Sequence, residues 1–375
     1  MSQAREPQHQ VLFRPIPFGR HSLKNRIVMS PMTRQRSPGG VPGEQSAAYY
    51  QRRAEGGVGL IVTEGTFIGH PAANGYTNVP DIFGPQALEG WKRVVGAVHQ
   101  AGARIVPQLW HVGPIRRPGM GPDPQVPGYG PTEIKEGDDV VVKAMTLDDI
   151  EQVIAAYAQA ARDAQAAGFD GVEIHGAHQY LIDSFIWSRS NQREDDYGGS
   201  LANRTRLAAR VVRAVREATA PDFPIMFRFS QWKISDYEAR IVDNADELKV
   251  FLDILVEAGV DIFDVSTRRF WEPAFEGSAD SLAAWTRRLS GKPVMMVGSV
   301  GLDKAYSIAQ LRGSESPDAG QADLAPVLEQ LQSGAVDLVA LGRMLLADPQ
   351  WPNKVFENRL LDIKRFDREA MMTDV

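Results

Sequence analysis

Short apolar runs alternate with longer amphipathic runs over most of the chain. The amphipathic runs, such as those that begin at Leu147 and Asn244, repeat apolar residues every three or four positions, and this spacing predicts helices. The short runs are apolar through their length, which is typical of strands that are covered on both faces. They lie at residues 27–30, 60–63, 104–109, 171–175, 225–229, 262–266, 294–297 and 338–341.

Glycine follows several of the predicted helices just before the next strand, at Gly102, Gly168, Gly259 and Gly334. Glycine commonly ends a helix because it adopts left-handed backbone angles without strain. Eight successive strand–helix units predict a fold of the α/β class, a single (β/α)8 TIM barrel, with residues 1–375 as one domain. A doubly wound parallel sheet is the alternative, although no G-x-G-x-x-G turn follows an early strand.

Two segments fall outside this alternation. Residues 1 to about 24 precede the first strand, and we expect them to form an N-terminal cap. Residues from about 113 to 143 are rich in Gly and Pro, and a structureless stretch this long inside a compact domain is usually functional or disordered. Because barrel enzymes carry their active sites at the carboxyl ends of the strands, we expect this stretch to be an irregular loop over the catalytic face.

Composition excludes several kinds of site and partner. The 375 residues are 43% hydrophobic and 23% charged, which is ordinary for a globular protein. A net charge of −6 without a polybasic run gives no support for a nucleic-acid or membrane partner, while self-association stays open. The absence of cysteine excludes disulfides, thiolate nucleophiles and cysteine-ligated clusters. With a polar start and no apolar run near 20 residues, we expect a soluble, cytoplasmic protein.

The stretch "VEIHGAHQYLIDSF" holds the most distinctive chemistry. His175 and His178 cannot share a face within a strand, but they can if a helix begins near Gly176, since residues three apart are neighbours on a helix. Two imidazole N–H groups would then converge on one oxygen atom, with the Tyr180 phenol as a proton donor. The alternatives are structural histidines or a metal pair, for which Glu173 is the only further ligand nearby.

Arg228 and Arg343 stand at the ends of apolar strands, where an unpaired charge would be costly. One interpretation is an ion pair with a barrel carboxylate such as Glu64 or Glu173. The other is a bound anion: TIM barrels often hold a phosphate after strands seven and eight, where this chain has "VGS" and "LGR". Glycine at these positions allows a ligand to approach the backbone closely.

Aromatic side chains follow several strand ends. Trp110 and Trp232 come directly after predicted strands, and Trp271 lies in the loop "RRFWEPAFEG". Packing in the core is the ordinary role of such residues. We expect these three to line a substrate pocket, with Trp271 as part of a lid.

The motifs "NRIVMSPMTR", "VGLIVTEGT", "QLWHVG", "GFDGVEIHGAH", "NQREDDYGGSLANRTR" and the closing "LGR" occur in this order. With them, nearly the whole chain resembles the old yellow enzyme family of ene-reductases. The resemblance implies a barrel that holds FMN and takes hydride from NAD(P)H by ping-pong kinetics. It implies reduction of the activated C=C bond of α,β-unsaturated carbonyls or nitroalkenes.

The resemblance also implies residue roles. His175 and His178 would bind the carbonyl or nitro oxygen of the alkene, and Tyr180 would supply a proton. The residues implied for FMN are Pro31, Met32, Thr33 and Gly65 at the ring, Gln108 and Arg228 at its pyrimidine edge, and Gly298, Ser299, Gly342 and Arg343 at the phosphate. No metal is implied.

Three departures from the family pattern concern the substrate pocket. Gln179 stands where glycine is usual, Pro114 replaces a common arginine, and residues 231–240 differ from the better-known members. Other flavin-barrel dehydrogenases are an alternative that the absence of cysteine disfavours. A flavin-binding protein without turnover and a metal-dependent barrel lyase that uses His175 and His178 are further alternatives.

Overall fold

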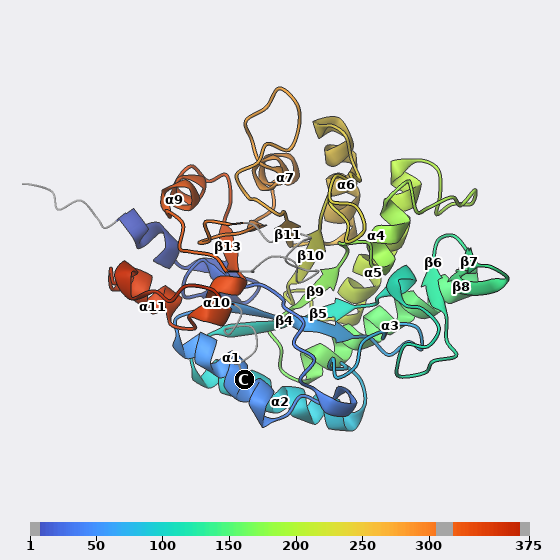
Figure 1. Cartoon of the computed structure of the whole chain (residues 1–375), viewed down its shortest axis with the longest axis horizontal. Helices are drawn as coiled ribbons and strands as arrows, with labels where there is room; N and C mark the ends of the chain where they lie inside the picture. The colour runs from blue at the N-terminus through green and yellow to red at the C-terminus, as the bar shows by residue number, and fades with distance from the viewer. Residues whose placement is uncertain (1–7, 305–317, 368–375) are drawn as a thin grey trace, which may run out of the picture.

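A computed structural model of the chain describes residues 8–304 and 318–367. All eight expected strands form, and they close into one parallel barrel in chain order, so the doubly wound alternative is wrong (Figure 1). The barrel strands are β3 (Ile27–Met29), β4 (Leu60–Phe67), β5 (Arg104–Trp110), β9 (Val172–His175), β10 (Ile225–Phe229), β11 (Ile262–Ser266), β12 (Val294–Val297) and β13 (Leu338–Leu341). β4 extends beyond its expected end because pairing with β5 resumes at Gly65 after a shift in register.

Helices surround the barrel (Figure 1). They are α1 (Glu44–Glu55), α2 (Pro85–Gln100), α3 (Leu147–Ala166), α4 (Leu181–Ile186), α5 (Leu201–Ala218), α6 (Ala245–Ala258), α7 (Leu282–Ser290), α9 (Ala325–Gln332), α10 (Arg343–Ala347) and α11 (Trp351–Phe356). Short 3-10 turns are η1 (Gln8–Phe13), η2 (Pro38–Gly40), η3 (Gly113–Ile115) and η4 (Leu360–Asp362).

The helix signals of the sequence act locally as expected. Thr146 and Asp149 form a reciprocal capping box at the start of α3, and the side chain of Asn244 accepts a hydrogen bond from the Glu247 N–H at the start of α6. Gly259 ends α6 with φ +115°, and its N–H donates to two carbonyls of the last turn.

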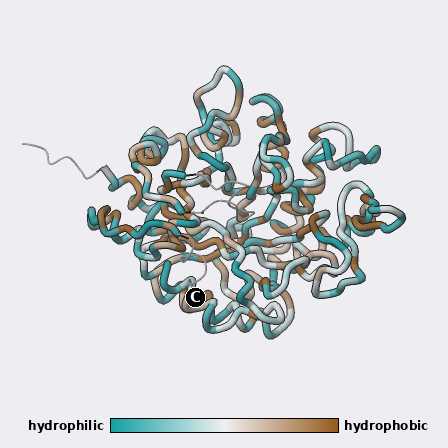
Figure 2. Tube along the Cα trace, viewed as in Figure 1, coloured by the Kyte–Doolittle hydropathy of each residue, from teal (hydrophilic) through white to brown (hydrophobic). Residues whose placement is uncertain are grey.

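Apolar side chains fill both the barrel and the space between its strands and helices, and Figure 2 shows hydrophobic residues concentrated in the barrel strands. Residues 1–7 of the expected cap lie outside the described residues. Within residues 8–24, β1 (Ile16–Phe18) and β2 (His21–Leu23) form an antiparallel hairpin. The apolar residues of this hairpin pack in one cluster with barrel-interior residues such as Val62 and Met226, so the hairpin closes one end of the barrel.

The segment 113–143 is not the irregular loop that its glycines and prolines predicted. It contains η3 and leads into a three-stranded sheet of β6 (Gly128–Gly130), β7 (Ile134–Glu136) and β8 (Asp139–Ala144), which stands to one side of the barrel (Figure 1). Gly137, at φ +65°, makes the turn between β7 and β8. The strands form because Val141 and Val142 of β8 are buried.

Over the described ranges, no helix has the length and apolar character needed to cross a membrane.

Candidate active site

A cleft of about 280 Å³ opens at the carboxyl ends of the barrel strands. We call it the central cleft. It gathers predicted site residues from five strand ends and the loops after them: Pro31, Met32, His178, Arg228, Trp232, Gly298, Ser299, Gly342 and Arg343. Residues far apart in the sequence therefore meet where barrel enzymes place their chemistry.

The other predicted residues lie around this cleft or farther away. Gln108 is buried in β5, and Trp110, at the end of β5, lies against Gly65 so closely that a Cβ on Gly65 would come 2.3 Å from its ring. Thr33 is exposed in the segment after β3. Trp271 is 47% exposed and packs edge-on against Phe270.

His175 and His178 are adjacent, as expected, with ring centroids 5.2 Å apart and ring planes nearly perpendicular. The expected helix near Gly176 is wrong, however. The Gly176 N–H still pairs with the Arg228 carbonyl of β10 at 2.8 Å, so the chain is held in the sheet at this point. The reversal comes instead from two left-handed residues, His178 at φ +64° and Gln179 at φ +75°, and α4 begins only at Leu181.

Hydrogen bonds fix the orientation of His175. Its Nδ1 atom accepts from the Ala177 N–H at 3.3 Å, so in the neutral ring the proton is on Nε2. Burial and the neighbouring Arg228 hold the pKa of His175 well below its usual range. The side chain is therefore a neutral donor.

His178 is oriented through Ser266. The Ser266 Oγ atom lies 2.8 Å from His178 Nε2 and also accepts from Arg228 Nη2 at 3.2 Å. Because a guanidinium can only donate, the hydroxyl proton of Ser266 is free to go to His178 Nε2, which leaves the imidazole proton on Nδ1. Burial, His175, Arg228 and Lys233 all lower the pKa of His178, so this ring is neutral too.

The left-handed bend is held by buried polar contacts. The N–H of His178 donates to Ser230 Oγ at 3.1 Å, and the N–H of Gln179 donates to Asp183 Oδ2 at 2.7 Å. The other oxygen of Asp183 pairs with Lys233 Nζ at 2.7 Å, and both side chains are fully buried. Lys233 belongs to the divergent segment 231–240, so this segment supports the histidine bend.

Tyr180 completes the cluster. Its ring lies edge-on to His175 at 4.9 Å and to Trp110 at 4.8 Å. Burial and the neighbouring Tyr76 raise the pKa of Tyr180 well above its usual range. Tyr76 lies in the loop after β4 and was not among the residues predicted from the sequence. Its ring stacks on Trp110 with the ring centroids 5.4 Å apart. No local pattern singles it out, because its partners belong to other strands.

The ion-pair partner of Arg228 is neither Glu64 nor Glu173. Arg228 pairs with Asp264, its neighbour in the register of β10 and β11. Glu64 instead accepts from the N–H of Arg34 at 2.8 Å, and burial raises its pKa to about 7. Glu173 accepts from Gln108 Nε2 at 2.8 Å.

Residues after β12 and β13 form a concave basic end of the central cleft. Gly298 has φ +148°, and a Cβ there would come 2.4 Å from Thr267 Oγ1, so only glycine fits. Arg343 Nη2 lies 3.5 Å from Ser299 Oγ and donates to the Lys304 carbonyl at 3.0 Å. A guanidinium beside a hydroxyl, with the backbone of Gly298 and Gly342 lining the same cleft, suits a phosphate.

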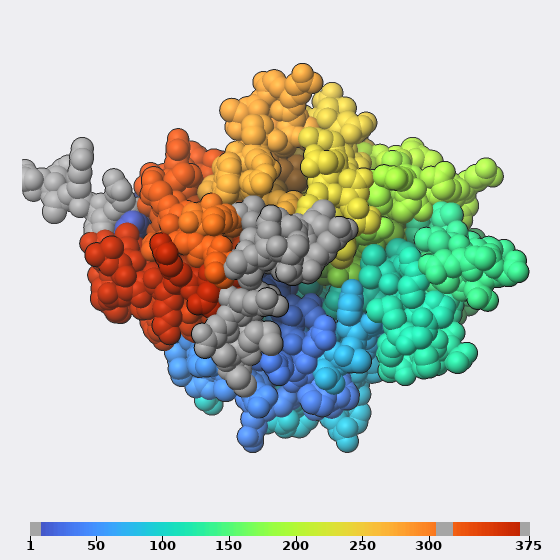
Figure 3. Space-filling view, viewed as in Figure 1, coloured from blue at the N-terminus to red at the C-terminus, as the bar shows by residue number. Residues whose placement is uncertain are grey.

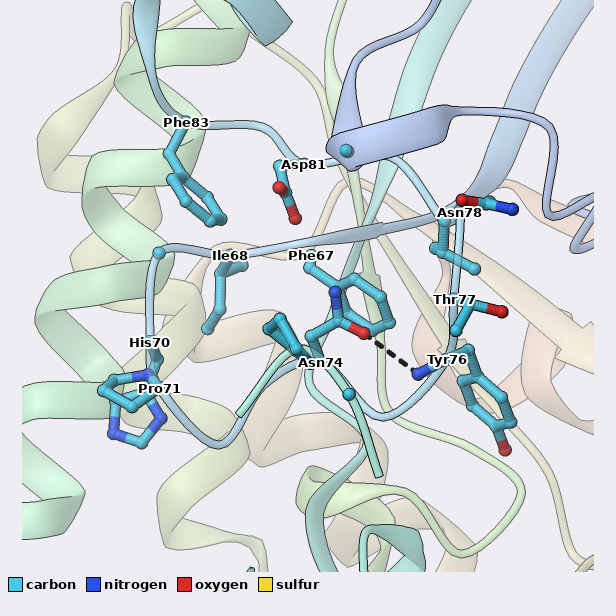
Figure 4. A pocket seen from close by; sticks show the side chains of 16 residues that line it. Phe67, Ile68, His70, Pro71, Asn74, Tyr76, Thr77, Asn78, Asp81 and Phe83 are labelled. Atoms are coloured by element: carbon cyan, nitrogen blue, oxygen red, sulfur yellow. Dashed lines mark hydrogen bonds between the residues drawn. The ribbon is translucent and has the colours of Figure 1, made fainter. Parts of the chain in front are cut away.

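Two further cavities adjoin this region. One, of about 580 Å³, lies between residues 231–240 and 266–274, where Figure 3 shows a recess between the yellow and orange segments. The other, of about 550 Å³, is lined mainly by the loop 67–83 (Figure 4). The Asp81 carboxyl reaches into the latter, and burial raises its pKa to about 7. Neither cavity holds the histidine pair.

Among the residues that the structure describes, no three His, Cys, Asp or Glu side chains form a group that could hold a metal ion. His175 and His178 are engaged by the backbone and by Ser266, and Glu173 is engaged by Gln108. This arrangement gives the metal interpretation no support.

Comparison with known proteins gives one consistent group. Residues 11–316 match the model of the NADH:flavin oxidoreductase / NADH oxidase family. The chain is 33% identical over 372 residues to the flavin oxidoreductase hxnT of Emericella nidulans, which covers 96% of this chain and 93% of that protein. Morphinone reductase in complex with tetrahydroNAD superposes with a TM-score of 0.79 at 29% identity, covering 96% of this chain and 93% of that one. Old Yellow Enzyme from Pichia sp. AKU4542 superposes with a TM-score of 0.75 at 28% identity, and the match covers 96% of this chain and 89% of that one.

Proposed function

We propose that this protein reduces activated alkenes with electrons from NAD(P)H. The premise is that the chain belongs to the NADH:flavin oxidoreductase / NADH oxidase family, which is the family of the old yellow enzymes, and is an FMN-dependent oxidoreductase. The substrates proposed are α,β-unsaturated carbonyls and nitroalkenes. The observation that carries this proposal is the meeting of two neutral histidine donors and a high-pKa tyrosine beside a phosphate-type cradle.

The residues at the two ends of the central cleft suit FMN. At one end, Gly298, Ser299, Gly342 and Arg343 combine close backbone approach with a cation and would hold the phosphate. At the other end, the Arg228 side chain is buried and its Nε atom has no hydrogen-bond acceptor among the described residues. A flavin edge that carries negative charge when reduced would complete this site.

The residues that would meet the ring itself lie after β3 and within β4 and β5. Pro31 and Met32 line the central cleft, and we assign Thr33, Gly65 and Gln108 to the same ring from the family pattern. Bound FMN would supply the two-electron chemistry, taking hydride from NAD(P)H and passing it to the β-carbon of the alkene.

The two histidines polarise the alkene. His175 Nε2–H and His178 Nδ1–H are the donors left free by the hydrogen bonds described above, and both would be directed at the carbonyl or nitro oxygen. As neutral groups they donate hydrogen bonds to the developing negative charge without transferring a proton.

Tyr180 supplies the proton at the α-carbon. Its raised pKa keeps the phenol protonated at neutral pH, and Tyr76 can hydrogen-bond the phenolate that forms. Trp110 and Trp232 form walls beside the donors, since Trp110 stacks at 6.0 Å from His175 and Trp232 lies 4.3 Å from His178. We assign Trp271 to the outer edge of the pocket.

Reductant and alkene would compete for the same pair of donors. They would therefore bind in turn, which gives ping-pong kinetics. Trp232 and Tyr237 belong to the divergent segment and both line the central cleft, with their rings edge-on to each other and the centroids 5.6 Å apart. They would influence which substrates enter.

An anaerobic spectral titration of the purified protein tests the proposal. We expect a yellow protein that bleaches when NADPH or NADH is added and regains its colour when cyclohexenone follows. Bleaching without recovery, also with nitroalkenes, would contradict the assigned substrates but keep the flavin site. A colourless protein that takes up no added FMN would contradict the whole proposal.

A further inference from the structure

Four polar side chains meet inside the barrel, below the donors of the central cleft. They are Gln108 of β5, Glu173 of β9, Arg228 of β10 and Asp264 of β11, and each is at most 6% exposed. Strand register brings them together, because Gln108 is paired with Glu173 and Arg228 with Asp264. Two buried acids and one base thus lie together, and of the four side chains Arg228 also lines the central cleft.

Hydrogen bonds use only one oxygen of each acid. Glu173 Oε1 accepts from Gln108 Nε2 at 2.8 Å, and Asp264 Oδ2 accepts from the Arg228 guanidinium. Glu173 Oε2 and Asp264 Oδ1 are both buried without a donor among the N–H and O–H groups that the structure describes. Two acceptors left in this way are costly unless a proton lies between them.

Each carboxyl group acts on the pKa of the other, as neighbours in one buried cluster do, and each has one oxygen without a donor. If both were ionised they would repel, and the buried cluster would carry a net charge of −1, since Arg228 supplies the only positive charge of the four. With one proton the cluster is neutral and both remaining oxygens are satisfied. Buried acids that share a site commonly settle on this arrangement.

The contacts also show which acid keeps the proton. Asp264 is ion-paired directly with Arg228, which favours its ionised form, whereas the one hydrogen bond of Glu173 comes from the neutral amide of Gln108 and Arg228 acts on it without a direct bond. Burial raises the pKa of both acids, and the charge of Asp264 raises the pKa of Glu173 further. The ionised partner is therefore Asp264.

We propose that Glu173 and Asp264 share one proton, carried by Glu173, and that this pair is a positioning device for the flavin. Protonated Glu173 fixes the amide of Gln108, and ionised Asp264 offsets part of the charge that Arg228 presents to the pyrimidine edge. The effect on the flavin rests on the proposed function, while the shared proton does not.

The two acids therefore have unequal effects on the flavin. Asp264→Asn removes a negative charge next to Arg228, which favours the anionic reduced flavin. Glu173→Gln replaces a protonated acid by a neutral side chain of the same shape and leaves the charge of the cluster unchanged. The second variant is the matched control of the first.

The midpoint potential of bound FMN in wild type and both variants tests this asymmetry. We expect Asp264→Asn to favour the reduced state about tenfold, a rise of about 30 mV for a two-electron couple. Glu173→Gln should shift the equilibrium by less than about twofold. A larger shift in Glu173→Gln than in Asp264→Asn, or no shift in either, would overturn the assignment.

Infrared spectroscopy of the wild-type protein tests the proton independently of the flavin. A protonated-carboxyl C=O band at neutral pH that persists without FMN, and that Glu173→Gln removes while Asp264→Asn keeps it, is the expected result. Absence of that band from the wild-type protein would overturn the shared proton. If the band is present but no FMN binds, the shared proton stands and the proposed function fails.

Discussion

Lys233 and Asp183 form a 2.7 Å ion pair between two side chains that are both fully buried. Each has a further partner: the Ser230 carbonyl accepts from Lys233 Nζ at 3.2 Å, and Asp183 accepts the N–H of Gln179. The pair therefore joins the loop after β10 to the bend that presents His178. Desolvation lowers the pKa of Lys233 and raises that of Asp183, so both charges depend on the partner.

Removing the cation should destabilise the protein strongly. In Lys233→Met the Asp183 charge loses its counter-ion inside the protein, and we expect a loss of about 3–5 kcal/mol in the free energy of unfolding. Denaturant unfolding measures it. The exposed pair Arg189–Asp236 is the control, and Arg189→Met should cost at most about 1 kcal/mol. Equal losses in the two variants would show that burial of the Lys233 pair has no special effect.

Ser266→Ala should impair alkene reduction. Without the hydroxyl, nothing directs the His178 proton to Nδ1. We expect the rate of the alkene step to fall by up to about 10²-fold, the lower end of the loss that follows removal of one transition-state donor. Stopped-flow mixing of pre-reduced enzyme with cyclohexenone measures this step. Ser290→Ala, on the remote α7, should leave it unchanged, because Ser290 Oγ bonds only its own neighbourhood: it donates to the Thr286 carbonyl and accepts from the Lys292 N–H. An unaltered rate in Ser266→Ala would refute the role of Ser266 in orienting the His178 proton.

Tyr180→Phe should separate the two half-reactions. We expect alkene reduction to fall on the order of 10²- to 10⁴-fold, the usual contribution of a general acid, while reduction of the flavin by NAD(P)H survives. Tyr76→Phe should have a smaller effect, since it keeps the ring that stacks on Trp110 and removes only a hydroxyl that acts on Tyr180. Unchanged alkene turnover in Tyr180→Phe would remove this residue from the mechanism.

The alkene step should not depend on pH near neutrality. Burial lowers the pKa of His175 and His178 and raises that of Tyr180, so neither a histidine near pH 6.5 nor the tyrosine near pH 10 should titrate in its ordinary range. We expect a flat rate from about pH 6 to about pH 9 in single-turnover experiments. A step near pH 6.5 would mean that one imidazole is charged during catalysis.

Asp81→Asn should stabilise the protein at alkaline pH. The pKa of Asp81 is raised to about 7, so the folded protein holds this proton more tightly than the unfolded chain, and the stability that it contributes is lost as pH rises towards 7. Asparagine has no charge to desolvate. In denaturant unfolding, the free energy of unfolding of Asp81→Asn should exceed that of wild type at pH 8 by on the order of 1 kcal/mol, after allowance for partial exposure of the side chain. The difference should vanish near pH 4. A gain that is equal at both pH values would contradict this origin.

The barrel strands could be predicted because each is covered on both faces and its sequence is therefore apolar throughout. The ion partner of Arg228 could not, since it depends on the register between β10 and β11, which apolar runs do not specify. The histidine bend was also beyond prediction. His178 and Gln179 adopt left-handed angles that their residue types do not favour, and contacts from Ser230 and Asp183 hold them there.

The small sheet β6–β8 escaped prediction for another reason. Its strands are short, and the glycines and prolines around them indicate turns more strongly than the buried valines indicate a strand. The same segment holds Arg116, whose guanidinium is buried and bonded to backbone carbonyls, including that of Met120. Composition alone gives no sign of such an anchor.

Tyr76 has three relationships at once: its ring stacks on Trp110, it raises the pKa of Tyr180, and it lines the 550 Å³ cavity of Figure 4. It belongs to the loop after β4, whereas the histidines and Ser266 are carried by β9 and β11. Under the proposed function, the hydrogen-bond donors and this cavity wall are therefore encoded in separate stretches of the gene. Substitutions in the loop after β4 would then alter the cavity without changing the strands that carry the donors.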